Sequence, residues 1–401
     1  MNRELWTVIN LSVVTCLMFL GSTIIGPILP QYALGFDISI ALSGWAVSAF
    51  SLARVVTDLP AGLLADRAGK RPVMVGGLIC VALSSVLAAF AGSYDVFLLA
   101  RGMQGFGTAL YGTSAMAWVA RVAAGPSRGK VMSAYTGLVF LGISFGPAVG
   151  GLVAAAYGLS APFWLYAALA GAGIFAMIPL KESSDPHTHS AKLVGRAATQ
   201  IREMLSDRSF VLISIAVFAM FFLNAGFLST LVPLYAALNL SLPEDQIGLI
   251  LVLATIGTAI TVLPSGWLSD RIGRKLPNMS CLFVSAATLV LVPLQGSFLS
   301  LAIVMLGYGL ASGLRGSIGA WPAGLSPPER LEMTMGIYRV FGDIGMVVGP
   351  VFVTYVANWL NPDAITSAPF LLSAILALFA GIALLGARDP TAKLTRNRPI
   401  E

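Results

Sequence analysis

Long apolar stretches separated by short polar segments follow one another along almost the whole chain. Each stretch is close to the ~20 residues that an α-helix needs to cross a bilayer, whereas a membrane β-barrel would give short segments of alternating hydrophobicity. The pattern therefore predicts an all-α polytopic membrane protein with about twelve transmembrane helices. We expect these helices over residues 8–33, 41–65, 72–92, 96–119, 131–157, 162–180, 209–237, 246–269, 277–295, 298–323, 333–358 and 366–387.

A polar segment divides the predicted helices into two groups of six. Residues 181–208 combine charged and small polar residues with an amphipathic basic stretch, which is typical of a linker with a short surface helix. The expected organisation is an N-terminal bundle (1–180), a cytoplasmic linker (181–208) and a C-terminal bundle with a short tail (209–401). The two histidines, His187 and His189, fall in the linker, where solvated side chains are favoured over a metal or pH-sensing site.

The two halves repeat one another. Residues 58–71 and 262–275 align without gaps and share a Leu-Pro pair, two glycines and an Asp-Arg pair at matching places. Two parallel six-helix repeats are typical of a secondary transporter whose substrate site lies between the halves, near the middle of the membrane. Further matched positions are Pro30 with Pro233, Tyr32 with Tyr235, Gly142 with Gly345 and Gly146 with Gly349.

Charged residues are scarce and unevenly placed. Only 10% of the 401 residues are charged and 57% are hydrophobic, whereas soluble proteins have roughly a quarter charged residues. Most Lys and Arg residues fall in alternate loops, and the loops between them carry only acids. This positive-inside distribution places both termini and the linker in the cytoplasm, and it explains the net charge of +6 without a nucleic-acid partner.

Several of these segments resemble signature motifs of the major facilitator superfamily, and the resemblance covers the whole chain. Gly62-x-x-x-Asp66-Arg67-x-Gly69-Lys70-Arg71 is similar to motif A, and Asp270 and Arg271 lie in its second copy. Arg101-x-x-Gln104-Gly105 resembles motif B. The glycines from Gly142 to Gly151 resemble motif C, which is associated with antiporters. Pro27-x-x-Pro30-x-x-Ala33 resembles the helix 1 signature of the twelve-helix drug:proton antiporters.

The resemblance implies that the motif A residues form a conformational latch. Asp66 is expected to pair with neighbouring basic groups and a helix end across the halves, which stabilises the outward-open state. The alternative is that these basic turns only orient the chain. One departure from the drug antiporters is that helix 1 has no acidic residue between Leu5 and Gly35. The latch residues are Gly62, Asp66, Arg67, Gly69, Lys70, Arg71, Asp270 and Arg271.

The motif C residues form a packing surface. Gly142, Gly146 and Gly150 recur at every fourth position, with Gly151 beside them, so a neighbouring helix can approach closely. Pro147 removes a backbone hydrogen bond and can kink the helix. We expect this segment to control how the halves move and not to contact substrate.

Six ionisable residues lie inside the predicted spans, where charge is costly and is therefore a sign of function. The second predicted helix carries Arg54 and Asp58, and the eleventh carries Arg339 and Asp343. In the resembled fold these helices face each other and run antiparallel. Asp58 and Arg339 then both lie roughly 10 Å from the cytoplasmic helix ends, and Arg54 and Asp343 about 16 Å. We predict that each of these pairs forms a salt bridge of a cytoplasmic-side gate, with proton coupling through one carboxylate; the alternative is an i, i+4 pair within each helix.

The other two ionisable residues, Arg101 and Arg315, have no acidic partner in the spans. Arg101 lies on a polar helix face that should border a water-filled cavity, and the helix of Arg315 repeats this face. Because the planar guanidinium matches carboxylate and phosphate, Arg315 favours an anionic or zwitterionic substrate. Asn224 lies among phenylalanines that either form an aromatic wall or simply pack. The predicted cavity residues are Arg101, Gln104, Thr108, Tyr111, Asn224, Tyr308, Ser312 and Arg315.

These features predict a secondary active transporter of the bacterial inner membrane that works by alternating access. We expect proton-coupled efflux of a small amphipathic or anionic organic compound or drug. The alternatives are an organic-anion exchanger or importer without proton coupling and a membrane sensor that does not transport. The sequence shows no metal-ligand cluster, nucleophile–base pair or phosphate-binding loop, so we expect neither an enzyme nor a cofactor. The expected partners of this monomer are a small-molecule substrate, protons and the lipid bilayer.

Exchanging charges tests the gate. Arg54→Asp or Asp343→Arg alone should reduce transport tenfold or more, since an uncompensated buried charge costs about 3–5 kcal/mol. The double variant should recover most of the lost rate in dye uptake by inside-out vesicles. Rescue by exchanging Arg54 with Asp58 instead would contradict the gate and support pairing within one helix.

Overall fold

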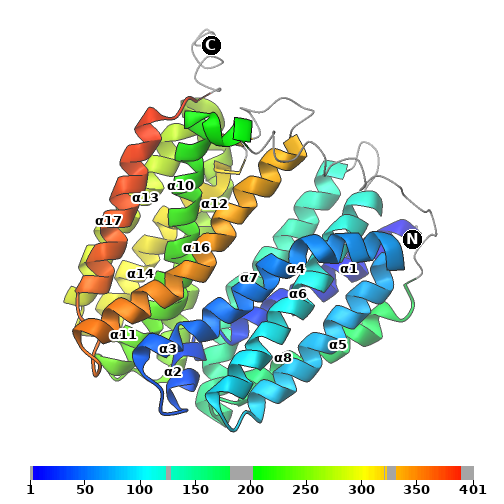
Figure 1. The fold of residues 1–401 in the computed structure, drawn as a ribbon, viewed down its shortest axis with the longest axis horizontal. Helices are drawn as coiled ribbons and strands as arrows, with labels where there is room; N and C mark the ends of the chain where they lie inside the picture. The colour runs from blue at the N-terminus through cyan, green and yellow to red at the C-terminus, as the bar shows by residue number, and fades with distance from the viewer. Residues whose placement is uncertain (1–2, 123–127, 181–201, 320, 323–330, 390–401) are drawn as a thin grey trace. The chain divides into compact units, whose positions relative to one another are not determined.

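The computed structural model describes residues 3–122, 128–180, 202–319, 321–322 and 331–389 (Figure 1). Helices make up nearly all of this described chain, and no strand occurs in it. Within these ranges, ten helical segments are long and apolar enough to cross a membrane, and the apolar helix Ala161–Met177 is somewhat shorter. The all-helical membrane architecture predicted from the sequence is therefore confirmed. Most of the predicted linker, including His187 and His189, lies outside the described residues.

The chain divides into two compact units. Unit 1 is Met1–Ser190 with Pro243–Leu249, and unit 2 is Ala191–Leu242 with Ile250–Glu401. Unit 1 contains α1 (Arg3–Ile24), α2 (Leu29–Leu34), α3 (Ile40–Ser43), α4 (Trp45–Ala68), α5 (Lys70–Ala89), α6 (Tyr94–Val122), α7 (Arg128–Tyr157) and α8 (Ala161–Met177). Unit 2 contains α10 (Arg208–Phe222), the π-helical η1 (Leu223–Leu231), α11 (Val232–Leu238), most of α12 (Glu244–Ile272), α13 (Lys275–Leu291), η2 (Val292–Leu294), α14 (Phe298–Gly313), η3 (Leu314–Ser317), α16 (Leu331–Leu360), α17 (Ala368–Ala383) and η5 (Leu384–Gly386).

The first spanning segment of each unit departs from the single helix that the sequence predicts. In unit 1, α1 ends at Ile24, and α2 begins after a turn with Pro30 in its first turn. In unit 2, the π-helical η1 interrupts the helix just before α11, which has Pro233 in its first turn. A proline lacks the backbone N–H and clashes with the preceding turn, so a helix tolerates it best at its start. The matched prolines thus explain the matched interruptions.

A tyrosine fixes the short helix that follows each interruption. The Tyr32 hydroxyl donates to the Ala88 carbonyl of α5 (2.8 Å), and the Tyr235 hydroxyl donates to the Gln295 carbonyl just after η2 (2.8 Å). Each ring also packs against the phenylalanine near the start of its unit's last long helix, at 4.9 Å and 5.5 Å between ring centroids. The sequence repeat therefore extends to individual contacts inside each unit.

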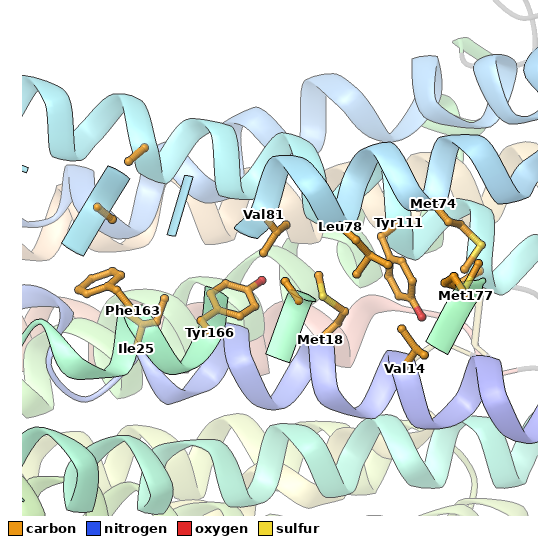
Figure 2. Packing of buried hydrophobic residues seen from close by; sticks show 14 of the residues in the cluster. Val14, Met18, Ile25, Met74, Leu78, Val81, Tyr111, Phe163, Tyr166 and Met177 are labelled. Carbon is orange, nitrogen blue, oxygen red and sulfur yellow. The ribbon is translucent and has the colours of Figure 1, made fainter. Parts of the chain in front are cut away.

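The core of unit 1 contains tyrosines whose hydroxyl groups are satisfied within the core. Figure 2 shows Tyr111 and Tyr166 among aliphatic side chains of α1 and α5. The Tyr111 hydroxyl bonds to that of Thr15 (3.0 Å), and the Tyr166 hydroxyl to that of Thr108 (3.3 Å). A Cβ at Gly21 of α1 would collide with the Tyr166 ring, so this glycine makes room for it. Buried phenols need such partners because an unpaired polar group is costly away from water.

Glycines bring α7 against the backbone of α1. A Cβ at Gly142 would lie 2.5 Å from the Cys16 carbonyl oxygen, and a Cβ at Gly150 would collide with the Ile24 carbonyl. In unit 2, a Cβ at Gly349 of α16 would lie 2.7 Å from a carbonyl oxygen of α10. Small residues allow such close helix approach in membranes, where van der Waals contact replaces the hydrophobic effect between helices. Each unit thus joins its first and fifth long helices through backbone contact.

Two glycines of α7 provide a matched test of this contact. Gly150→Ala should lower the stability of the purified protein by about 1–3 kcal/mol, because the new methyl group forces α7 away from α1. Gly137→Ala should leave stability unchanged or raise it by about 0.5–1 kcal/mol, since nothing lies within 4 Å of that position. Thermal unfolding in detergent measures both. Equal unfolding temperatures for the two variants would contradict the packing role.

Candidate functional site

The two motif A copies form the same turn. Gly69 joins α4 to α5 with φ of +91°, and Gly273 follows α12 with φ of +88°. Glycine adopts this left-handed backbone at no steric cost, which explains its recurrence. Asp66 and Arg67 are exposed at the end of α4, while Lys70 is buried at the start of α5. The latch role of these residues stays a prediction.

Gly62, a predicted latch residue, makes no close approach to a neighbouring backbone. A Cβ there would meet only the Thr113 methyl carbon, at the ordinary distance of 3.8 Å. Gly266, the matching residue, has nothing within 4 Å. Among the motif A glycines, the backbone conformation thus requires glycine only at the turn positions, Gly69 and Gly273.

The last basic residue of each turn binds the carbonyl groups at the end of a distant helix. Arg71 donates from Nη2 to the Ile178 carbonyl (2.8 Å) and from Nε to the Met177 carbonyl (3.3 Å), at the end of α8. Lys275 donates from Nζ to the Ala387 carbonyl (3.2 Å) and to the Leu385 carbonyl, at the end of η5. A cation at a helix C-terminus satisfies carbonyls that have no partner within the helix and interacts favourably with the helix dipole.

The carboxylate of Asp58 has a neutral partner inside unit 1. It is half-buried on α4 and accepts a hydrogen bond from the Thr113 hydroxyl of α6 (3.0 Å). Arg54 is half-buried one turn earlier on the same helix. In unit 2, Asp343 is half-buried on α16 and Arg339 is exposed. The predicted salt bridges between these two helices stay predictions.

Sequence reasoning missed Thr113. It lies beyond the polar stripe that the helical spacing of α6 defines, so its spacing gave no signal. Its methyl group is next to Gly62, and its hydroxyl bonds Asp58. The carboxylate could have suggested a neutral hydrogen-bond donor on a neighbouring helix, but only the fold identifies which one.

The Arg101 side chain is 5% exposed and lies inside unit 1. Its Nε donates to the Ala46 carbonyl of α4 (2.9 Å), its Nη1 donates to the Gln104 amide oxygen, and its guanidinium lies 4.9 Å from the Phe50 ring centroid. Gln104 donates in turn to Ser85 of α5 (3.0 Å). Neutral groups thus satisfy this charge, and the network ties α6 to α4 and α5.

The other residues on the polar face of α6 also bond to side chains within unit 1. Thr108 and Tyr111 are buried and bond to Tyr166 and Thr15, on α8 and α1. These contacts support helix packing within unit 1, and substrate contact stays a prediction for the whole face.

The corresponding face of α14 belongs to unit 2. The Ser312 hydroxyl bonds to that of Thr258 on α12 (2.8 Å), and the Tyr308 ring packs against Phe227 of η1 at 4.9 Å between centroids. Arg315 is half-buried in η3, and its Nη1 lies 3.4 Å from the Met220 carbonyl oxygen. Asn224 is half-buried in the π-helical η1. Phe227, one of the phenylalanines near Asn224, packs on Tyr308, and the role of Asn224 in an aromatic cavity wall stays a prediction.

The sequence matches the Major Facilitator Superfamily over residues 11–243 and again over 215–400. The chain belongs to the major facilitator superfamily. It is 26% identical over 376 residues to an uncharacterised transporter of this type from Methanocaldococcus jannaschii, covering 92% of this chain and 95% of that one. It is also 25% identical to multidrug resistance protein 2 of Bacillus subtilis, covering 83% and 84%. The solved nucleoside transporter NupG has the same fold, with a TM-score of 0.78 at 14% identity over 94% and 99% of the two chains.

Family membership makes this protein a multi-pass membrane transporter and not an enzyme. The recognition made from the motif A copies is thereby confirmed. Among the residues that the structure describes, no group of three or more His, Cys, Asp or Glu side chains could hold a metal ion.

Removing the helix-end cations should loosen each unit. Arg71→Gln is expected to lower the free energy of unfolding by about 1–2 kcal/mol, because two carbonyls at the end of α8 lose a charged donor. Lys275→Gln should have a similar effect through η5. Arg67→Gln, which removes the same charge from an exposed position of the same turn, is the control. Thermal unfolding of the purified variants measures the difference, and equal losses for Arg67 and Arg71 would contradict the capping role.

Proposed function

We propose that this protein is a proton-coupled efflux transporter for small amphipathic or anionic organic compounds. It works by alternating access in a bacterial inner membrane, with both termini in the cytoplasm. Protons move inward as the compound moves outward. The multidrug resistance protein among its relatives and the glycine run of motif C support export.

The hydrogen bond between Asp58 and Thr113 is the observation that carries proton coupling. A proton carrier in the membrane needs a carboxylate that can exist in both charge states. A threonine hydroxyl can donate to the carboxylate and accept from the carboxylic acid, so it serves both states. Asp58 is half-buried and therefore partly open to solvent. A carboxylate in this position has the chemistry that a coupled transporter requires.

The internal construction of the units supports alternating access. Within each unit, backbone contact at glycines and a cation at the end of the last long helix hold the helices together. Two internally fixed bodies can rock against each other around a central substrate site. The motif A turns, with Asp66 and Asp270, are then the latch, and the charges on α4 and α16 are the gate.

A second candidate is an organic-anion exchanger or importer without proton coupling. The absence of an acid between Leu5 and Gly35 and the presence of Arg315 favour it. The two candidates differ in their response to a pH gradient. A coupled transporter moves protons with substrate, whereas an uncoupled exchanger does not.

Asp58→Asn tests the proposal in proteoliposomes that contain a pH-sensitive dye. The wild type should show substrate-dependent proton movement, and Asp58→Asn should reduce it at least tenfold, because an amide cannot carry a proton. Thr113→Val should slow proton movement by a smaller factor. Asp95→Asn, at the start of α6, is the control and should behave as the wild type. Full proton movement in Asp58→Asn would exclude this residue as the carrier, and none in the wild type would favour the exchanger.

A further inference from the structure

The half-buried Arg315 makes fewer hydrogen bonds to the protein than the buried Arg101. Arg101 bonds a carbonyl and an amide oxygen and lies over a ring. Arg315 makes one hydrogen bond within the described chain, the 3.4 Å contact with the Met220 carbonyl. A guanidinium has five N–H donors, so four of them are left for other acceptors. A cation inside a membrane protein costs free energy unless other groups accept its remaining hydrogen bonds.

The backbone that carries Arg315 is fixed. It follows directly on α14, where Gly313 and Gly316 flank it. A Cβ at Gly313 would collide with the Thr261 hydroxyl, and a Cβ at Gly316 would collide with the hydroxyl of Ser265. Both positions therefore press against α12. The Arg315 side chain projects from a held segment, which reduces the entropy lost when it binds a ligand.

Two phenols near Arg315 also have spare donors. Tyr308 is 2% exposed and Tyr338 is 8% exposed, and neither hydroxyl has a hydrogen-bond partner in the described chain. Tyr308 precedes Arg315 by about two helical turns, and a Cβ at Gly319, one turn after Arg315, would lie 3.6 Å from the Tyr338 hydroxyl. Each phenol hydroxyl can therefore donate to a ligand that reaches Arg315. The sequence indicated Tyr308 but not Tyr338, which comes from α16.

We propose that Arg315, Tyr308 and Tyr338 form an anion site in unit 2 that binds the carboxylate of the transported compound. The planar guanidinium matches the two oxygens of a carboxylate, and phenol hydroxyls donate to the same oxygens. The Phe227 ring, packed on Tyr308, supplies an apolar neighbour for the organic part. This proposal depends on the proposed function in one respect, which is that the bound carboxylate belongs to the transported compound.

Binding of benzoate and salicylate tests the site, with benzamide and salicylamide as neutral matches. Titration calorimetry on the full-length protein in neutral detergent should show carboxylate binding that Arg315→Gln weakens about tenfold or more. Arg315→Lys should bind carboxylates more tightly than Arg315→Gln but less tightly than the wild type, because lysine keeps the charge and lacks the planar pair of N–H donors. Tyr338→Phe should weaken binding severalfold and keep the fold. Arg388→Gln removes a cation elsewhere in unit 2 and should bind as the wild type.

The outcomes distinguish a carboxylate ligand from the phosphate of a lipid. Equal carboxylate affinity in the wild type and Arg315→Gln, or no carboxylate binding to the wild type, overturns the proposal. Binding of phosphatidylglycerol that needs Arg315, without carboxylate binding, assigns the site to lipid phosphate and also overturns it. The titration uses no pH gradient. Arg315-dependent carboxylate binding in a protein that moves no protons would therefore refute the coupling alone.

Discussion

The need to satisfy every charge without water governs how this protein is built. Arg101 is surrounded by neutral acceptors and a ring inside unit 1. Arg71 and Lys275 use the carbonyl groups that a helix end leaves unpaired. Asp58 has a threonine hydroxyl. A charge inside a membrane protein is costly when protein groups do not satisfy it, so Arg315, which makes one hydrogen bond in the described chain, is more informative about function than these satisfied residues.

The two units share a scaffold and differ in charge. Helix interruptions, a hydrogen-bonded tyrosine, backbone contact at glycines and a helix-end cation occur in both. The polar groups do not repeat: Val262 stands in the place of Asp58, and Tyr111, whose hydroxyl is bonded, stands in the place of Arg315. Packing constrains both copies equally, because each must close a six-helix core. The functional polar residues need not repeat, since a binding site needs such residues from only one of the two copies.

The sequence predicts the fold well because apolar length and repeat are local properties. Its helix ranges differ from the observed ones mainly where prolines interrupt the first span of each unit. Residues that act through partners distant in sequence were harder to predict. Thr113 and Tyr338 lie beside charged residues only after the helices pack. The polar face of α6 also shows the limit of spacing, which identifies a shared face but not whether protein or a cavity lies against it.

The proposed proton carrier and the proposed anion site belong to different units. Asp58 is in unit 1 and Arg315 is in unit 2, so the proton and the carboxylate would bind different side chains. Coupling would then act through the conformational states of the whole transporter. Each ligand would favour one arrangement of two fixed bodies, and thermodynamic linkage requires the effect to be reciprocal. The rigidity of each unit, built from glycine contacts and capped helix ends, is what would let a protonation event in one unit change binding in the other.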